Sequence, residues 1–199
     1  MQTVTTVAEL RQQIDTWKNQ GNTIVFVPTM GNLHAGHLAL VKHAHNCGDK
    51  VVCSIFVNAL QFDRSEDLKA YPRTPEQDLA ALRSKNVDLV FMPEHNDVYS
   101  EEQKSPLDIP KYPLNEQLCG KYRPGFFDGI VEVVARHFNI VTPDVAVFGE
   151  KDYQQLIIIK QLVEDMGYPI QIEQVPTKRE EDGLAYSSRN SYLNPKQRA

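Results

Sequence analysis

Two histidines, His34 and His37, stand three residues apart in a segment that also contains Gly31 and Gly36. If a helix has begun by His34, both rings lie on one side of it, because residues three apart are neighbours on a helix surface. Glycine lets the backbone approach an anion at a helix start, and a cationic imidazole would stabilise charge on a leaving phosphate chain. The pair therefore indicates a phosphate site. One alternative is that both are incidental surface histidines. A histidine metal site is less favoured, because a stable site usually has more than two protein ligands.

Three other segments carry polar groups directly after apolar runs. Gly149, Lys151 and Asp152 combine a glycine with a cation and an acid at a predicted helix start, although an ordinary solvated helix terminus has the same composition. Residues 187–189, Ser-Ser-Arg, supply donors suited to phosphate oxygens, or simply form a turn. Gln61 would orient a polar substrate, but a lone amide proves nothing. Together with the histidines, these segments favour one nucleotide bound between an early and a late part of the chain.

The elements that position these side chains alternate between strand-like and helical patterns. Ligands bind beyond the carboxyl ends of strands in such proteins, which is where the polar segments lie. The alternation predicts an α/β fold with a Rossmann-like open, mostly parallel sheet and helices on both faces. Residues 93–124 show no clear period, with room for short strands around 107–109. The predicted strands are 23–27, 51–57, 87–91, 145–148 and 170–175, and the predicted helices are 7–20, 36–46, one starting at 75, 129–141 and 153–166.

Composition narrows the class of protein. The 199 residues are 41% hydrophobic, enough for one full-sized domain, and the net charge of -5 provides no basic field that would attract nucleic acid. The three cysteines have no CxxC spacing, which argues against a disulfide framework and a cysteine zinc site. There is no leader and no apolar run of membrane-spanning length, so we expect a cytoplasmic protein that binds neither membrane nor nucleic acid.

The motifs resemble two nested groups of enzymes. His34-Ala-Gly-His37 is similar to the HIGH signature of class I synthetase-type nucleotidyltransferases, and residues 187–189 resemble their KMSKS loop. A larger set of segments resembles the pantothenate synthetase (pantoate–β-alanine ligase) family and extends from about Val25 to the end of the chain. These segments are residues 27–34, 54–58, 61–62, 71–74, 148–155 and 182–190.

The resemblance implies a ligation in two steps. Pantoate attacks the α-phosphate of Mg-ATP to give pantoyl adenylate and pyrophosphate, and β-alanine then displaces AMP to form pantothenate. ATP is thus a substrate, and Mg²⁺ is expected to be held mostly by its phosphates, helped through water by Asp78, without a direct protein ligand. The resemblance also implies a homodimer. A nucleotidyltransferase acting on another acceptor, and an ATP-binding domain with little activity, remain alternatives.

The resemblance also assigns roles to individual residues. His37 is the expected catalytic proton donor. Gln61 and Gln155 are expected to hold pantoate, Gln61 also lies where β-alanine enters, and Asn58 lines the same pocket. Lys178 is expected to contact the adenine side through its backbone. The residues expected to bind ATP are Met30, Gly31, Asn32, Leu33, His34, Ala35, Gly36, His37, Gly149, Glu150, Lys151, Asp152, Lys178, Tyr186, Ser187, Ser188 and Arg189.

The chain also departs from the family pattern. Ala59 replaces a usual proline, which would loosen the loop that carries Gln61, and Phe126 replaces a usual histidine. The expected domain comprises residues 1–185, and residues 186–199 form a phosphate-binding loop and the start of a connection. Family members continue into a small C-terminal lid domain, so we expect an isolated N-terminal domain that binds ATP but turns over slowly, because a lid keeps water from the adenylate.

Overall fold

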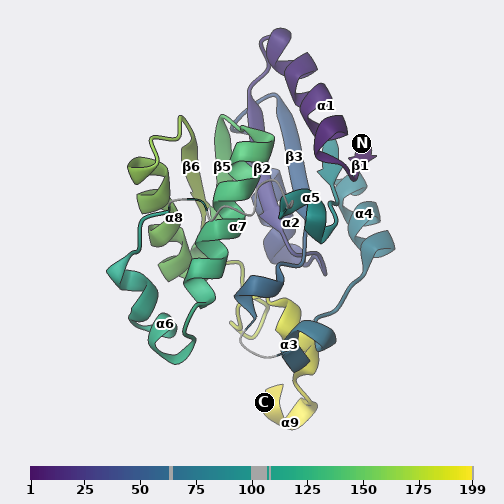
Figure 1. The fold of residues 1–199 in the computed structure, drawn as a ribbon. Helices are drawn as coiled ribbons and strands as arrows, with labels where there is room; N and C mark the ends of the chain where they lie inside the picture. The colour runs from purple at the N-terminus through teal and green to yellow at the C-terminus, as the bar shows by residue number, and fades with distance from the viewer. Residues whose placement is uncertain (63–64, 100–106, 108, 199) are drawn as a thin grey trace.

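The computed structural model describes residues 1–62, 65–99, 107 and 109–198, and within them six strands form one sheet (Figure 1). Their order is β1-β4-β3-β2-β5-β6, and each neighbouring pair runs parallel. The expected α/β class is therefore confirmed. The strands are β1 (Gln2–Val4), β2 (Ile24–Thr29), β3 (Lys50–Ile55), β4 (Leu89–Phe91), β5 (Val145–Gly149) and β6 (Gln171–Val175).

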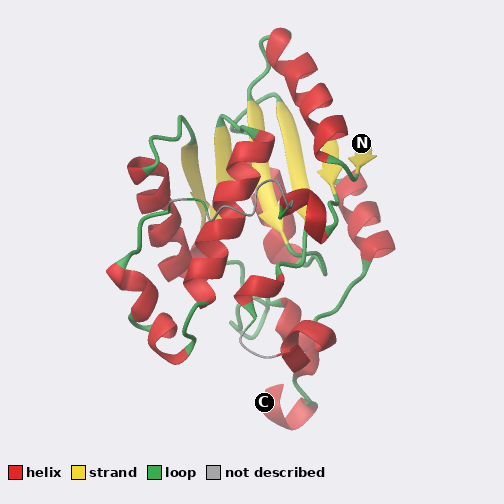
Figure 2. Cartoon of the chain, in the orientation of Figure 1, coloured by secondary structure: helices red, strands yellow, loops and turns green. Residues whose placement is uncertain are grey.

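Helices cover both faces of this sheet, as Figure 2 shows by colour. The α-helices are α1 (Val7–Asn19), α2 (Ala35–Ala44), α3 (Ser65–Ala70), α4 (Pro75–Ser84), α5 (His95–Val98), α6 (Cys119–Tyr122), α7 (Phe126–Val141), α8 (Tyr153–Asp165) and α9 (Pro195–Arg198). Short 3-10 turns are η1 (Ala59–Gln61), η3 (Pro113–Glu116), η4 (Glu150–Asp152) and η5 (Ser188–Tyr192). In the described part of the chain, no helix combines the length and apolar character needed to cross a bilayer.

The alternation of side chains along β2 divides the core between the two faces. Ile24 and Phe26 pack in a cluster with residues of α1, α7 and α8, whereas Val25 and Val27 pack in a second cluster with residues of α2 and α4. A strand sends successive side chains to opposite faces, so an unbroken apolar strand requires cover on both. The continuous apolar runs in the sequence therefore mark central strands of a sheet that is covered on both sides.

Local signals place the helix starts. Thr6 caps α1, and Glu9 completes a capping box by accepting the Thr6 backbone N–H at 3.2 Å. Pro75 opens α4, where its missing N–H costs no hydrogen bond. Helix α7 begins three residues before the predicted position 129, after Gly125 in a left-handed conformation (φ 79°).

Two features of the fold were not predicted correctly from the sequence. Strand β1 was not predicted, because three residues are too few to show a period, and it forms by pairing with β4 at the sheet edge. The short strands expected around 107–109 are not found at Leu107 or Ile109, and residue 108 lies outside the described residues.

Candidate functional site

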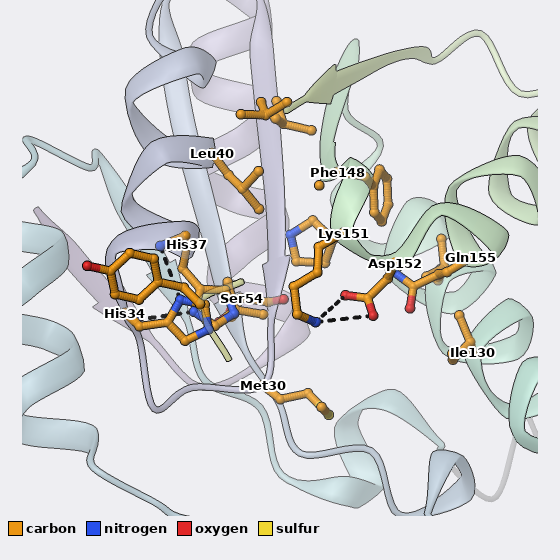
Figure 3. Close-up of a pocket in the computed structure, with 18 of the residues that line it drawn as sticks. Met30, His34, His37, Leu40, Ser54, Ile130, Phe148, Lys151, Asp152 and Gln155 are labelled. Carbon is orange, nitrogen blue, oxygen red and sulfur yellow. Dashed lines mark hydrogen bonds and ion pairs between the residues drawn. The ribbon is translucent and has the colours of Figure 1, made fainter. Parts of the chain in front are cut away.

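A cavity of about 1160 Å³, counting space open to solvent, lies where β2, β3, β5 and β6 end (Figure 3). The carboxyl ends of these strands meet at one edge of the sheet, so residues far apart in sequence converge there. The predicted site residues that line the cavity are Met30, His34, Gly36, His37, Asn58, Gln61, Gly149, Lys151, Asp152, Gln155, Lys178 and Tyr186. Those that do not line it are Gly31, Asn32, Leu33, Ala35, Glu150, Ser187, Ser188 and Arg189.

The two histidines cap the start of α2 with their own rings. His34 is the N-cap residue, and its Nδ1 accepts the backbone N–H of Gly36 at 3.1 Å. The Nδ1 of His37 accepts the backbone N–H of His34 at 3.3 Å, and the two rings stack with centroids 4.0 Å apart. Because each Nδ1 accepts a hydrogen bond, the neutral form of each ring carries its proton on Nε2. Each imidazole is therefore a neutral Nε2–H donor.

The surroundings keep these rings uncharged. Burial lowers the pKa of His37 to about 3, and the charges of His34 and Lys151 act in the same direction. Burial, followed by Lys151, also lowers the pKa of His34. At neutral pH the ligand-free protein therefore has neutral imidazoles at this position, not the cations that the sequence indicated. Lys151 is the cation that acts on both of them.

Lys151 lies in the short turn between β5 and α8. Its ammonium contacts Asp152 at 3.0 Å to Oδ2 and 3.3 Å to Oδ1. Figure 3 shows the Lys151 side chain extending across the cavity between the histidine pair and Asp152. The pair is partly exposed, so the ammonium can exchange Asp152 for a stronger anion at little cost.

The loop before α2 is held by a carboxylate from α4. Asp78, which is 2% exposed, accepts the backbone N–H of Asn32 at 2.9 Å and that of Leu33 at 2.7 Å, one on each oxygen. Gly31 and Asn32 both have positive φ, 76° and 48°, so the chain turns sharply there. Asp78 therefore fixes this loop, and the water-mediated contact with Mg²⁺ that the sequence led us to expect would use the remaining lone pairs of its oxygens.

Asn58 lines the neighbouring part of the cavity and is fully hydrogen-bonded within the protein. Its Nδ2 donates to the Gln61 side chain at 3.1 Å and to the Gly129 carbonyl at 3.0 Å. Its Oδ1 accepts from the Tyr99 hydroxyl at 3.0 Å and from the Leu60 N–H at 3.3 Å. These bonds use both donors and both lone pairs of the amide. Asn58 therefore positions Gln61, and the predicted contact of Asn58 with substrate requires that one of these bonds be exchanged.

The two predicted substrate amides lie on different walls. Gln61 is at the end of η1, and its Nε2 lies 3.0 Å from the Met30 sulfur. Gln155 is in the first turn of α8, and no described group hydrogen-bonds its amide. Both amides are thus available to a polar ligand, since a thioether is only a weak acceptor.

The two departures from the family pattern lie beside this wall. Ala59 begins η1 directly after Asn58, whose side chain accepts the Leu60 N–H as the N-cap of this turn. Turn η1 also packs so closely on α7 that a Cβ on Gly129 would lie 2.4 Å from the Leu60 carbonyl oxygen. Phe126 lies beneath the Arg123 guanidinium, 3.4 Å from its carbon to the ring centroid.

The late segment folds over the histidine loop. The Tyr186 ring stacks beside His34 at 6.0 Å, and its backbone N–H donates to the Lys178 carbonyl at 3.1 Å. The Ser188 hydroxyl donates to the Asn32 carbonyl at 3.1 Å. The Ser187 hydroxyl instead accepts the backbone N–H of Arg189, and Ser187 is thereby the N-cap of η5. Early and late motifs are thus in direct contact, whereas the sequence predicted only that both would reach one nucleotide.

Two residues that line the cavity were not predicted from the sequence to do so. Ser54 and His137 line the cavity and are 1% and 3% exposed, and the Ser54 hydroxyl and His137 Nε2 have no hydrogen-bond partner among the described groups. Burial lowers the pKa of His137 to about 4, and its ring stacks on Phe26 at 5.8 Å. The helical pattern marks position 137 only as buried, and no sequence signal shows which buried positions border a cavity.

The amino-acid sequence of the chain matches one protein family. Residues 2–199 match the family model described as pantoate-beta-alanine ligase. The pantothenate synthetase of Aeromonas hydrophila is 55% identical over 199 residues, which are 100% of this chain and 70% of that protein. The pantothenate synthetase of Neisseria meningitidis is 51% identical over 100% of this chain and 69% of its own length. The chain thus spans about 70% of these relatives.

Solved structures give the same result. Pantothenate synthetase from Thermus thermophilus superposes with a TM-score of 0.92 at 48% identity, over 100% of this chain and 70% of that one. The pantoate-beta-alanine ligase of Francisella tularensis, complexed with beta-gamma ATP and beta-alanine, gives 0.91 at 39% identity, over 98% and 74%. A tyrosyl-tRNA synthetase from Archaeoglobus fulgidus, at 0.57 and 16% identity over 92% and 63%, shares the fold alone.

Proposed function

Because the chain belongs to the pantoate–β-alanine ligase family, which forms pantothenate with ATP, we propose that adenylation of pantoate takes place in the cavity described above. The observation that carries this proposal is the convergence of His34, His37 and Lys151 with two amides at one edge of the sheet. The donors suit a triphosphate, and the amides suit a hydroxy acid. One cavity therefore offers places for both reactants.

The proposed chemistry requires positioning more than reactive protein groups. A pantoate carboxylate oxygen forms a bond to the α-phosphorus, the bond from that phosphorus to the bridging oxygen breaks, and pyrophosphate leaves with the electron pair. Charge grows on the leaving phosphates, and fixed donors stabilise it without reorganising. We assign this role to the Nε2–H groups of His34 and His37, with His37 as the candidate proton donor once bound phosphate has raised its pKa.

Lys151 supplies the positive charge in this scheme. Its ammonium exchanges Asp152, 3.0 Å away, for the phosphate next to the reacting centre. The exchange costs little, because the Lys151–Asp152 pair is partly exposed, and the gain is larger inside the cavity. The lysine would thereby hold the nucleotide and lower the energy of the transition state.

Pantoate fits the opposite wall. Gln61 and Gln155 each offer a donor and an acceptor for its hydroxyl and carboxylate oxygens. Apolar side chains of α7 that line the cavity, Ile130, Val133 and Val134, suit the two methyl groups of pantoate. β-Alanine would then enter beside Gln61 and displace AMP from the acyl carbon.

Mg²⁺ is proposed to arrive with ATP. Each oxygen of Asp78 accepts a backbone N–H group, and Asp152 faces Lys151 only until the ammonium turns to a phosphate, so we assign no direct protein ligand to the ion. The ion would be held by the phosphates and water, as Mg²⁺ commonly is, and would neutralise charge on the leaving group. The residues present are compatible with that arrangement.

Residues 186–199 are proposed to act as a phosphate-binding segment attached to a domain that comprises residues 1–185. The Tyr186–His34 stacking and the Ser188–Asn32 hydrogen bond support this division of roles. A homodimer is also proposed, on the strength of the family resemblance. Light scattering at several protein concentrations would test the dimer independently of activity.

Exchange of labelled pyrophosphate into ATP tests the proposed function. We expect exchange that depends on pantoate and Mg²⁺ and that falls in a Gln155→Ala variant, with Gln161→Ala on the same helix as the control. Exchange supported equally by unrelated carboxylic acids or phosphorylated alcohols would favour another acceptor. ATP binding without exchange would instead identify a nucleotide-binding module.

A further inference from the structure

A group of potential metal ligands lies outside the proposed active site, where the end of α2 meets the edge strand β6. His43 is in the last turn of α2, Cys47 follows that helix, and Glu173 is in the middle of β6. One ligand atom from each residue lies within 4.8 Å of the other two. We propose that these three residues form a binding site for a transition-metal ion, with Zn²⁺ as the preferred occupant.

The contacts hold the three side chains close to one another. His43 Nε2 lies 2.9 Å from Glu173 Oε2, and the thiol of Cys47 reaches back to the His43 carbonyl at 3.3 Å. The other oxygen of Glu173 accepts from Gln171 at 2.6 Å, which leaves Oε2 as the single oxygen for a metal. His43 and Glu173 are 35% and 27% exposed, so an ion can enter from solvent.

The spacing is close to that of a tetrahedral zinc site. Zinc bonds of about 2.0–2.3 Å to nitrogen, oxygen and sulfur place tetrahedral ligand atoms roughly 3.4–3.6 Å apart. The His43–Glu173 contact would open by about half an ångström, and the longest separation would close by about one. Rotation of partly exposed side chains can supply both movements. Water would complete the fourth position.

The chemistry of the donors selects the ion. A thiolate and an imidazole favour Zn²⁺ over Mg²⁺ or Ca²⁺, which prefer oxygen ligands throughout. Binding releases the thiol proton of Cys47 to solvent and places the proton of the neutral His43 ring on Nδ1, so that sulfur and Nε2 can each donate an electron pair. The carboxylate of Glu173 binds as it stands.

The site joins two elements that also lead to the cavity. Helix α2 begins at His34 and His37, and β6 ends at Val175, which lines the cavity. A metal at the other end of α2 would fix the helix against the sheet edge, so its expected effect is structural. The sequence contains no cysteine pair with zinc-site spacing that would indicate this metal site. Its ligands His43 and Glu173 lie 130 residues apart in the chain.

Metal binding can be measured directly. The chain, without ATP, is dialysed against Zn²⁺ and the bound metal is quantified, and Co²⁺ is used in parallel because a thiolate ligand gives it a charge-transfer absorption band. We expect one Zn²⁺ per chain and a thiolate band with Co²⁺. Cys47→Ser and Glu173→Gln should each weaken Zn²⁺ binding by more than the roughly 10–100-fold that loss of an outer-sphere partner costs.

Controls separate this site from others. Cys119→Ser removes an exposed thiol elsewhere and should leave binding unchanged. Circular dichroism verifies that each variant is folded, and Glu173→Gln, at a partly exposed side chain, serves if Cys47→Ser does not fold. Absence of stoichiometric binding, or binding that survives both substitutions, would overturn the proposal. So would binding that is lost only when His34 and His37 are replaced, because the metal would then lie in the cavity.

Discussion

His37 owes its proposed role to a hydrogen bond that the start of its own helix provides. The His34 backbone N–H occupies Nδ1, and burial lowers the pKa of the ring to about 3, so Nε2–H is the group left for a phosphate. The same types of residue at another spacing would not give this tautomer. The sequence predicted the pair, but only the structure shows that the rings are neutral.

Replacing His37 by alanine should therefore remove one fixed donor. We expect pantoate-dependent pyrophosphate exchange to fall roughly 100- to 1000-fold, the usual cost of losing such a donor, while ATP binding changes less. His45→Ala, at the exposed C-terminal end of α2, is the matched control. Exchange at the wild-type rate in His37→Ala would exclude His37 as a catalytic residue.

Lys151 should have two measurable effects. Its charge lowers the pKa of both His34 and His37, so Lys151→Met should raise both pKa values, as nuclear magnetic resonance of the rings can show. The same variant should bind ATP about 10- to 100-fold more weakly, because a charge-assisted hydrogen bond is lost. Lys42→Met, exposed on α2, provides the comparison. Unchanged ATP affinity would mean that Lys151 does not contact the phosphates.

Helices and strands could be predicted where the sequence carries a hydrophobic period or a capping residue. They could not be predicted where tertiary contacts alone determine the structure. Thr6 and Pro75 marked helix starts correctly, and apolar runs marked five strands. Strand β1 depends on pairing with β4, which no local pattern reveals. Asp78 lies in the first turn of α4, and its contact with a loop 45 residues earlier follows only from the packing of that helix.

That contact gives a prediction about α4 and the histidine loop. Asp78→Asn replaces one acceptor with an amide N–H₂ group facing a backbone N–H, so the free energy of unfolding should fall by about 1–3 kcal/mol. ATP affinity should fall as well, because residues 31–33 lose their anchor. Urea unfolding and calorimetric ATP titration measure these effects, with Glu76→Gln in the same turn as the control. Unaltered stability would show that the loop is held by other contacts.

The buried His137 and the half-buried His37 make the stability of the whole molecule depend on pH. Burial lowers the pKa of His137 from 6.5 to about 4 and that of His37 to about 3. Between these values and 6.5 the unfolded chain binds more protons than the folded chain, so the free energy of unfolding should fall as pH falls. Above about pH 7 both states are neutral at these rings, and the effect disappears.

His137→Leu should reduce this dependence. The substitution removes a shift of about 2.5 pH units, worth on the order of 2–3 kcal/mol near pH 4, and it removes a buried nitrogen without a described partner. Urea unfolding of both proteins across this range measures the slopes, and their difference above about pH 7 reports packing alone. Equal slopes would show that His137 is not held neutral by the fold.

At the level of the whole chain, the motifs predicted the family, and the cavity lies at the edge of the sheet that they indicated. The parallel order explains why, since residues after β2, β3, β5 and β6 must converge at one end. Sequence could not separate residues that face the cavity from those that hold them. Asp78 has the chemistry of a ligand contact, but it does not line the cavity and holds the loop before α2, whereas Asn58 lines the cavity and also positions Gln61.

The central claim is that a pantoate carboxylate oxygen attacks the α-phosphorus of ATP in this cavity. The most direct measurement uses pantoate labelled with heavy oxygen in its carboxylate, incubated with the chain, ATP, Mg²⁺ and β-alanine, and mass spectrometry of the products. The account predicts AMP that carries one labelled oxygen. Label in inorganic phosphate, with ADP as the nucleotide product, would place the attack at the γ-phosphorus and contradict it.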